Sequence, residues 1–230
     1  MLIAIEGIDG SGKGTQAKRL LDRLLADGTS ASLLSFPRYS LTHFGRTIGR
    51  FLNGEFGALQ QVDPLLAATL YASDRFESKG FLLDQLAQFE VVICDRYVAS
   101  NTAHQGAKRA GEERRALQQW IAHTEYEVFG LPKADLTILF DLPASTAQSL
   151  IAQKAARDYT SKKADIQEAD GDYLSAVRDV YLDLASTSPD WVQIPCERNG
   201  QLRSMDDISD AVFQTVTQRL RETSQCVFKP

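Results

Sequence analysis

The sequence predicts an α/β fold in which a five-stranded parallel sheet is flanked by helices. Short apolar runs have the length of buried strands, and segments with helical spacing of apolar residues separate them. This alternation is typical of a doubly wound parallel sheet. In addition, the first run passes through a glycine-rich loop directly into a helix. The five runs cover residues 2–5, 32–36, 91–94, 136–143 and 191–196.

The loop after the first run is a predicted phosphate-binding loop. Gly7, Gly12 and Lys13 have the spacing G-x-x-x-x-G-K, in which glycine lets successive backbone N–H groups point at one anion. Lys13 supplies a charge, and the N-terminus of the helix over 15–28 supplies partial positive charge beside it. A turn that only joins a strand to a helix is the alternative. Strand, loop, lysine and helix nevertheless follow one another in the order that phosphate binding requires.

This loop departs from the strict motif at one position. Gly14 stands directly after the lysine, where Ser or Thr is usual, and a hydroxyl follows only at Thr15. The usual hydroxyl ligand for Mg²⁺ is therefore missing. Thr15 can still reach a phosphate oxygen, and a metal could be held through water and carboxylates.

Composition indicates a globular protein of 230 residues, most simply one domain over 1–230. A net charge of −5 argues against a general nucleic-acid binder, which needs a basic face. We expect no membrane partner, because no apolar run approaches the length of a membrane span and the N-terminus enters a strand without a basic leader. Three widely spaced cysteines without a C-x-x-C pair favour a reducing, cytoplasmic location.

The second strand ends in Phe36-Pro37-Arg38-Tyr39, where proline stops it. The right-handed crossover rule places the loop that follows on the side where the phosphate loop opens. We therefore expect Arg38 and Tyr39 at the same edge of the sheet, although a solvated loop charge is the simpler explanation of Arg38 alone. A short amphipathic helix within 43–57 comes next.

A long helix over 63–88, with Asp63 as its N-cap, is expected to be broken or bent near Gly80. Tyr71 and Arg75 lie four residues apart on this helix, so they share a face and can hold one planar ligand between them. Packing of the aromatic ring under the arginine stem is the alternative for this pair taken alone.

The third strand, 91–94, is a continuous apolar run that ends in Asp95-Arg96. Such a run is expected of a central strand buried on both faces. An aspartate at its carboxyl end lies beside the phosphate loop, where it can hold a water of Mg²⁺. Arg96 is placed to bind a second phosphate through two N–H groups. A surface ion pair that closes the strand is the alternative.

The helix after this strand carries Ser100, Asn101, His104 and Gln105 near its start. The last three share a face, where polar side chains can hydrogen-bond a sugar or a base. His104 by itself is more often a helix residue whose hydrogen bonds are satisfied within the protein. The remaining predicted helices cover 112–129, 144–156, 173–185 and 205–220.

The polar stretch 157–168 is a predicted lid. It carries Arg157 and two lysines beside Glu168. A solvated loop is the commonest explanation of such mixed charge. Next to a phosphate loop, we favour a lid that closes cations over a transferring phosphoryl group and excludes water. The end of the chain, from residue 224, is expected to fray.

Together these residues predict two phosphate sites at one edge of the sheet. A phosphate loop alone gives a nucleotide binder. Arg38 and Arg96, with Tyr71 and Arg75, add a place for an acceptor that carries its own phosphate and a flat base.

In these segments the sequence resembles the thymidylate kinase family, which transfers the γ-phosphoryl group of ATP to dTMP in dTTP biosynthesis. The resemblance implies a P-loop nucleoside monophosphate kinase fold, Mg²⁺ as cofactor and a homodimer. It touches most of the chain up to about residue 185, in the family's order. It is carried by IEGIDGSGKGTQ (5–16), FPRY (36–39), LYASDR (70–75), DRYVASN with HQGA (95–107), LPKAD with the following strand (131–143) and DIQEADGDYLSAVRDVYLDLA (165–185).

The resemblance also implies a role for each matching residue. The phosphate loop would cradle the ATP phosphates, with Lys13 on the β- and γ-phosphates; its residues are Gly7, Ile8, Asp9, Gly10, Ser11, Gly12, Lys13, Gly14 and Thr15. The acceptor would be bound by Asp9, Phe36, Arg38, Tyr39, Tyr71, Arg75, Arg96, Ser100, Asn101, His104, Gln105 and Glu168. The metal would be served by Asp9 and Asp95, and the catalytic residues would be Lys13, Arg96, Asp9 and Arg157.

Within this set, the resemblance implies that Tyr71 stacks on thymine and that Arg75 and Asn101 bond its edge. Three departures affect the expected site. Family members often have a tyrosine that excludes a 2′-hydroxyl where His104 stands. The loop also lacks an arginine that some members carry near Gly10, which shifts the catalytic cation to the lid. The lid is rich in lysine, so that Lys162 and Lys163 are alternatives to Arg157 as this cation.

Two other functions remain open at this point. A kinase for another nucleoside or nucleoside monophosphate would use the same fold and loop. A P-loop regulator without transfer chemistry would leave Arg38, Tyr71 and Arg75 without a role. Phosphoryl transfer requires positioning and cations rather than a protein nucleophile, and the predicted site supplies both.

Overall fold

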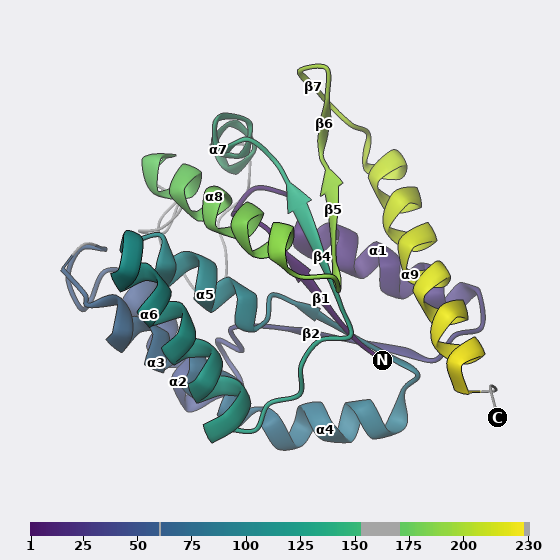
Figure 1. Ribbon diagram of the computed structural model, residues 1–230, viewed down its shortest axis with the longest axis horizontal. Coiled ribbons are helices and arrows are strands. Elements are labelled where there is room, and N and C mark those ends of the chain that lie inside the picture. The colour runs from purple at the N-terminus through teal and green to yellow at the C-terminus, as the bar shows by residue number, and fades with distance from the viewer. Residues whose placement is uncertain (60, 153–170, 228–230) are drawn as a thin grey trace.

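The computed structural model describes residues 1–59, 61–152 and 171–227, and five of their strands form one parallel sheet (Figure 1). The strand order is β2-β3-β1-β4-β5, which places β1 at the centre. This arrangement confirms the predicted fold class. The strands are β1 (Leu2–Glu6), β2 (Ala31–Ser35), β3 (Val91–Asp95), β4 (Leu136–Asp141) and β5 (Trp191–Pro195).

The central strands are buried because both faces of the sheet are covered. All five residues of β1 are buried, and so are the first four of β3. Alternate residues of β1 face opposite sides, so that Ile3 and Ile5 join one core cluster while Leu2 and Ala4 join the other. The continuous apolar runs in the sequence therefore reflect burial on two faces.

Helices cover both faces of the sheet (Figure 1). Helices α1 and α9 lie together on one face, and α5 and α8 lie together on the other. In the part of the chain that the structure describes, every helix is too short or too polar to cross a membrane. The bounds are α1 (Lys13–Ala26), α2 (His43–Leu52), α3 (Pro64–Glu77), α4 (Lys79–Gln88), α5 (Val98–Gly106), α6 (Gly111–Ala122), the π-helical segment η1 (His123–Val128), α7 (Ala144–Ala152), α8 (Gly171–Thr187) and α9 (Met205–Val227).

One predicted helix is divided as expected, and another is longer than predicted. The helix predicted over 63–88 is divided at Ser78, whose N–H donates to the carbonyl oxygens of Asp74 and Arg75, which confirms the break expected near Gly80. Helix α9, predicted over 205–220, continues to Val227 and so includes the start of the segment expected to fray, while 228–230 lie outside the described residues.

A small antiparallel hairpin is missing from the prediction. It consists of β6 (Glu197–Arg198) and β7 (Gln201–Leu202). Its turn is Asn199-Gly200, with φ angles of 53° and 74°. Asn-Gly is a strong hairpin signal, but the two strands are too short to show an alternating apolar pattern.

The carboxyl ends of β1 and β3 frame a crevice. After β1 the chain leads to α1 on one face of the sheet, and after β3 it leads to α5 on the other. Loops that diverge in this way leave room between them for a ligand. The predicted lid over 157–168, with Arg157 and Glu168, lies outside the described residues.

Candidate active site

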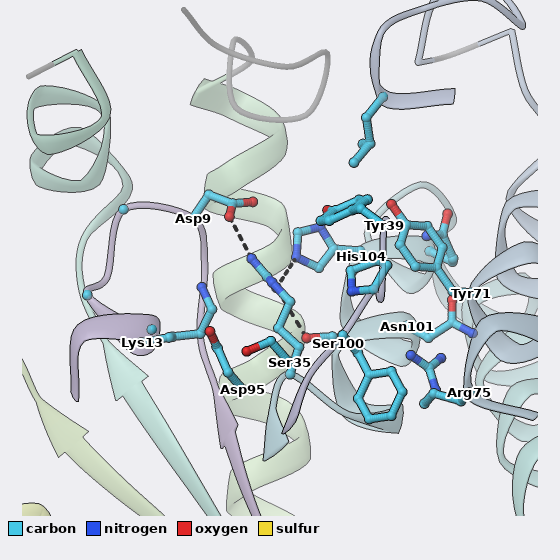
Figure 2. A pocket seen from close by; sticks show the side chains of 18 of the residues that line it. Asp9, Lys13, Ser35, Tyr39, Tyr71, Arg75, Asp95, Ser100, Asn101 and His104 are labelled. Carbon is cyan, nitrogen blue, oxygen red and sulfur yellow. Dashed lines mark hydrogen bonds and ion pairs between the residues drawn. The ribbon is translucent and has the colours of Figure 1, made fainter. Parts of the chain in front are cut away.

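A cavity of about 390 Å³ opens at the carboxyl ends of β1, β2 and β3 (Figure 2). Figure 2 shows Lys13 and Asp95 at one end, which we call the loop end, and Tyr71, Arg75 and Asn101 at the other, which we call the aromatic end. Most of the predicted site residues line this cavity: Asp9, Gly10, Gly12, Lys13, Gly14, Thr15, Phe36, Tyr39, Tyr71, Arg75, Asp95, Arg96, Ser100, Asn101, His104 and Gln105. Ser35, Pro37 and Leu52 line it as well.

Glycine shapes the phosphate loop at two positions. Gly7 has a φ of 142°, and a Cβ there would lie 2.7 Å from the carbonyl oxygen of Phe140 in β4. Gly10 has a φ of 86°, and a Cβ there would lie 2.5 Å from the carbonyl oxygen of Ala147 in α7. Both positions combine a backbone angle that favours glycine with the close approach of another backbone. The loop is thus packed against β4 and α7.

Lys13 is the first residue of α1, and its side chain folds back over the loop. Its Nζ donates to the carbonyl oxygen of Ile8 at 2.8 Å, and the side chain is buried. An ammonium group at the N-terminus of a helix is an arrangement that binds phosphate. Of the loop residues, Gly7, Ile8 and Ser11 are not among those that line the cavity.

Arg96 is held by three side chains. Its Nη2 donates to Asp9 Oδ1 at 2.6 Å and its Nη1 donates to Ser100 Oγ at 3.1 Å, while Nη1 also lies 3.2 Å from His104 Nε2. These contacts are the dashed lines in Figure 2. The Arg96 backbone has a φ of 67°, which is uncommon for a residue with a side chain. The guanidinium is therefore fixed before any ligand arrives.

His104 is a neutral hydrogen-bond acceptor for Arg96. An arginine only donates, so Nε2 of His104 accepts and the ring proton is on Nδ1. Nδ1 lies 3.1 Å from Tyr173 Oη, and that hydroxyl donates to the backbone carbonyl oxygen of His104 at 3.0 Å. Burial, followed by the charge of Arg96, lowers the pKa of His104 to about 3. His104 thus lines the cavity as an uncharged group at neutral pH.

Glu6 is a buried carboxylate that is not among the predicted site residues. It ends β1 and accepts hydrogen bonds from Ser100 Oγ at 2.5 Å, from Tyr181 Oη at 2.9 Å and from the Tyr97 N–H at 2.8 Å. Burial raises the pKa of Glu6, and these donors oppose the rise. Glu6 ties the end of β1 to the start of α5 and so fixes the hydroxyl that contacts Arg96. A carboxylate at the end of an otherwise apolar strand is the sequence signal that marks it.

Asp95 ends β3 at the loop end of the cavity. Its Oδ1 is buried and has no hydrogen-bond partner among the described residues. A Cβ added to Gly14 would lie 3.0 Å from the other carboxylate oxygen, Oδ2. Residues 1–59, 61–152 and 171–227 contain no cluster of three or more side chains arranged to hold a metal. A metal at Asp95 would therefore need further ligands from phosphate and water.

Arg75 forms a buried ion pair with Glu125 at the aromatic end. Its Nη2 donates to Glu125 Oε1 at 2.7 Å and its Nε donates to the other oxygen, and neither side chain is more than 2% exposed. Tyr71 lies one turn earlier on α3 and also lines the cavity. The two residues share a face of α3, as the spacing predicts, and the carboxylate fixes the guanidinium in the cavity wall.

Glu125 also holds the amide of Asn101. The Asn101 Nδ2 group donates to Glu125 Oε1 at 2.9 Å and to the carbonyl oxygen of Ala68 at 3.0 Å. With both amide hydrogens used, Asn101 Oδ1 is left buried and without a partner in the described part of the chain. One turn later on α5, Gln105 Nε2 is likewise buried and without a partner in the described part of the chain. Helix α5 therefore carries an acceptor and a donor that lack partners in the described residues, both on side chains that line the cavity.

Arg38 takes a different position from the other predicted acceptor residues. Its guanidinium lies 4.5 Å from the centre of the Phe81 ring, and its backbone N–H donates to Asp74 Oδ2 at 3.1 Å. Phe36 and Tyr39, from the same loop, line the cavity. A contact between Arg38 and an acceptor phosphate stays a prediction.

Comparison with known proteins gives matches over most of the chain. A family model described as thymidylate kinase matches residues 5–206. The chain is 34% identical over 186 residues to a thymidylate kinase of Mycobacterium tuberculosis, with 81% of this chain and 86% of that protein covered. It is 32% identical over 206 residues to a thymidylate kinase of Caenorhabditis elegans, with 79% and 88% covered.

A solved structure has a similar fold. The thymidylate kinase from Candida albicans superposes with a TM-score of 0.72, covering 94% of this chain and 91% of that one. The sequence identity in this comparison is 24%, so the likeness concerns the fold.

Proposed function

Because this chain belongs to the thymidylate kinase family and so transfers a phosphoryl group from ATP to dTMP, we propose that both nucleotides bind in the cavity described above. The observation that carries this proposal is the continuity of the cavity, whose lining extends from Lys13 to Arg75. The ATP phosphates bind at the loop end, and dTMP binds at the aromatic end. One cavity lets donor and acceptor meet in line, which direct transfer requires.

The thymine of dTMP is bound by side chains of α3 and α5. Thymine carries an N–H donor at N3 between two carbonyl acceptors. Asn101 Oδ1 accepts from N3, while Arg75 and Gln105 Nε2 donate to carbonyl oxygens. Tyr71 and Phe36 provide apolar ring surface beside the base. The match between the polar atoms that line the aromatic end and the edge of thymine supports this assignment.

The chemistry follows from the charge of the transferring group. Negative charge spreads over the equatorial oxygens of the moving phosphoryl group. Lys13 stabilises that charge from the donor side and Arg96 from the acceptor side. Asp9 and Ser100 already hold the guanidinium of Arg96, so little reorganisation is needed at the moment of transfer. The oxygen of the acceptor phosphate is an anion, and for that reason no general base is required.

We propose Asp95 as the protein ligand for Mg²⁺. Its Oδ1 is buried without a partner among the residues described, and Mg²⁺ prefers carboxylate and phosphate oxygens. Bound there, Mg²⁺ would neutralise charge on the ATP phosphates. Asp9 is paired with Arg96 at 2.6 Å, so we assign Asp9 to positioning that arginine.

Residues 157–168 stay a predicted lid, and Arg157 and Glu168 stay predicted site residues. We further propose that 1–230 forms one kinase domain that works in the cytoplasm. The free, buried thiols of Cys94 and Cys196 agree with a reducing compartment.

We propose that the protein is a homodimer formed through α3 and η1. Large apolar side chains are exposed on these two elements: Leu65 by 40%, Leu66 by 63%, Phe76 by 51% and Val128 by 64%. The rings of Phe76 and Phe129 lie 4.6 Å apart, so α3 and the end of η1 share one surface. Analytical ultracentrifugation should give the mass of a dimer for the wild type and of a monomer for Leu66→Glu. A monomeric wild type would contradict the proposal.

A steady-state assay of ADP release tests the assignment of the two ends. Asn101→Ala should raise the KM for dTMP by roughly tenfold and leave the KM for ATP nearly unchanged. Thr15→Ala, at the loop end, should raise the KM for ATP and spare the KM for dTMP. The assignment is wrong if Asn101→Ala acts on the KM for ATP instead.

A further inference from the structure

Gln105 is a fully buried amide that lies between the cavity and a lysine. The Lys108 Nζ group donates to Gln105 Oε1 at 2.9 Å. The nitrogen of the same amide, Nε2, is buried and has no partner within the described ranges, and Gln105 lines the cavity. One side of this amide therefore contacts an ammonium group, and the other side is left without a hydrogen-bond partner among the described residues.

A primary amide can rotate by half a turn and exchange its oxygen and nitrogen at almost no steric cost. An ammonium group only donates, so it accepts one of the two orientations and rejects the other. With the nitrogen toward Lys108, two donors would face each other inside the protein and a hydrogen bond would be lost. Lys108 therefore determines which atom Gln105 offers to the cavity.

We propose that Lys108 is a positioning residue that holds the Gln105 amide with its NH₂ group toward a carbonyl oxygen of the acceptor base. This inference rests on the proposed placement of dTMP at the aromatic end. Asn101 is fixed in the opposite orientation: Glu125 and Ala68 accept both of its amide hydrogens, so its oxygen is the atom left without a partner among the described residues. The Asn101 amide then presents an acceptor, which Glu125 and Ala68 select, and the Gln105 amide presents a donor, which Lys108 selects.

The surroundings of Lys108 support a role in orientation rather than in binding. Lys108 is not among the residues that line the cavity. Its Nζ lies 5.6 Å from the centre of the Phe51 ring. The adjacent Arg109 pairs with Asp63 at 2.9 Å, so that carboxylate is already matched by another cation.

The ionisation of Lys108 agrees with a role in orienting Gln105. Burial, followed by the charge of Arg109, lowers the pKa of Lys108 to about 8. At pH 7 most molecules therefore retain the ammonium form that only donates.

The first test compares three variants in the ADP-release assay. Lys108→Met removes the donor and keeps an unbranched stem, so it should raise the KM for dTMP by roughly tenfold and leave the KM for ATP unchanged. Lys108→Arg keeps a head group that only donates and should restore a KM for dTMP close to that of the wild type. Arg109→Met removes the neighbouring charge without touching Gln105 and should leave both KM values unchanged.

The second test identifies the contact with the base. The probes are 2-thio-dTMP and 4-thio-dTMP, in each of which one carbonyl oxygen is replaced by sulfur, a weaker acceptor. In the wild type, the analogue altered at the carbonyl that Gln105 contacts should have a raised KM. That penalty should disappear in Lys108→Met and persist in Lys108→Arg. Equal penalties in all three proteins overturn the proposal.

The outcomes separate this inference from the function on which it rests. If Asn101→Ala raises the KM for dTMP but Lys108→Met does not, the base binds at α5 and Lys108 does not orient Gln105. If neither variant changes that KM, the placement of dTMP itself is wrong. Should Lys108→Met fail to fold, the proposal is tested in the wild type by the side-chain NH₂ resonance of Gln105 in the ¹⁵N spectrum. This resonance is assigned by its loss in Gln105→Met. It should shift when dTMP binds. An unchanged resonance contradicts the proposal.

Discussion

Arg96 and Asp9 form an ion pair of 2.6 Å that joins the end of β3 to the phosphate loop. The side chains are only 16% and 12% exposed, so solvent screens the pair little. The pair connects the two ends of the cavity, because Asp9 belongs to the donor loop while Arg96 stands beside α5. A guanidinium held in this way is preorganised for the charge that develops during transfer.

The first prediction concerns the two cations that flank the transferring group. Lys13→Ala and Arg96→Ala should each lower kcat by about a hundredfold or more, the usual loss for one preorganised charge stabiliser. Arg96→Lys keeps the charge, but its single ammonium group cannot donate to both Asp9 and Ser100 as the two guanidinium nitrogens do. Its kcat should therefore lie between that of Arg96→Ala and that of the wild type. Turnover measured at saturating ATP and dTMP checks this. Near-normal kcat in either alanine variant would refute the assignment.

The second prediction concerns the buried ion pair at the aromatic end. Glu125→Gln removes the carboxylate that Arg75 bonds directly, and although the charge of Asp74 remains, loss of this buried ion pair should lower the free energy of unfolding by about 3 kcal/mol. The KM for dTMP should rise as well, because Glu125 orients both Arg75 and Asn101. Urea unfolding and the kinetic assay measure the two effects.

A surface pair provides the control for Glu125→Gln. Arg50 and Glu55 lie 2.7 Å apart, with side chains 60% and 48% exposed. Glu55→Gln should therefore change the unfolding free energy by less than about 1 kcal/mol. Equal losses for the two variants would show that burial of the Arg75–Glu125 pair does not matter.

The third prediction compares two glycines with the same backbone angle. Gly10 has a φ of 86° and Gly28 a φ of 84°, but only at Gly10 would a Cβ meet another backbone, at 2.5 Å from the carbonyl oxygen of Ala147. Gly28→Ala should cost about 1 kcal/mol of backbone strain and leave the kinetics unchanged. Gly10→Ala should also distort the phosphate loop and raise the KM for ATP several-fold. If the two variants behave alike, contact with α7 does not shape the loop.

The fourth prediction concerns the pH dependence of stability. The pKa of His104 is lowered to about 3 in the folded protein, from an ordinary value of about 6.5. As the pH falls below 6.5, the unfolded chain binds a proton that the folded protein does not. The free energy of unfolding should therefore decrease by up to about 1.4 kcal/mol per pH unit from this group, between pH 6.5 and pH 3.

The control for this effect is His104→Gln, which can still accept from Arg96 but does not titrate. Urea unfolding at pH 7, 6 and 5 should give a shallower loss of stability in the variant than in the wild type. Parallel curves would mean that His104 is not held neutral by the fold.

The fifth prediction concerns the metal. Asp95→Asn should raise the Mg²⁺ concentration needed for half-maximal activity by roughly tenfold, because a neutral amide is a weaker ligand for this ion. The KM for dTMP should remain unchanged. Asp141→Asn is the matched control, since Asp141 ends the neighbouring strand on the other side of β1 but pairs with Arg178 at 2.6 Å. An equal Mg²⁺ requirement in both variants would remove Asp95 from the metal site.

Much of this fold is predictable from the sequence, because its central elements have local signals. The strands of the parallel sheet are continuous apolar runs, and Gly7, Gly12 and Lys13 carry the phosphate loop at fixed spacing. Asp95 and Arg96 follow directly from their place at the end of a buried strand. Each of these inferences needs only a few neighbouring residues.

The residues that orient the site have weaker signals or none. Glu125 lies 50 positions from Arg75 on a π-helical turn, and no motif marks it as the partner of both Arg75 and Asn101. Lys108 similarly looks like an ordinary helix-end cation until its contact with Gln105 is known. Sequence spacing identifies side chains that can touch a ligand, but the partners behind them depend on tertiary packing.

The close approach of Gly14 to Asp95 links two positions that are far apart in the chain. A Cβ at residue 14 would lie 3.0 Å from Asp95 Oδ2, so any side chain there would require the carboxylate to shift by a few tenths of an ångström. The absence of a side chain at position 14 thus lets the start of α1 lie directly against the carboxylate that we propose as the metal ligand.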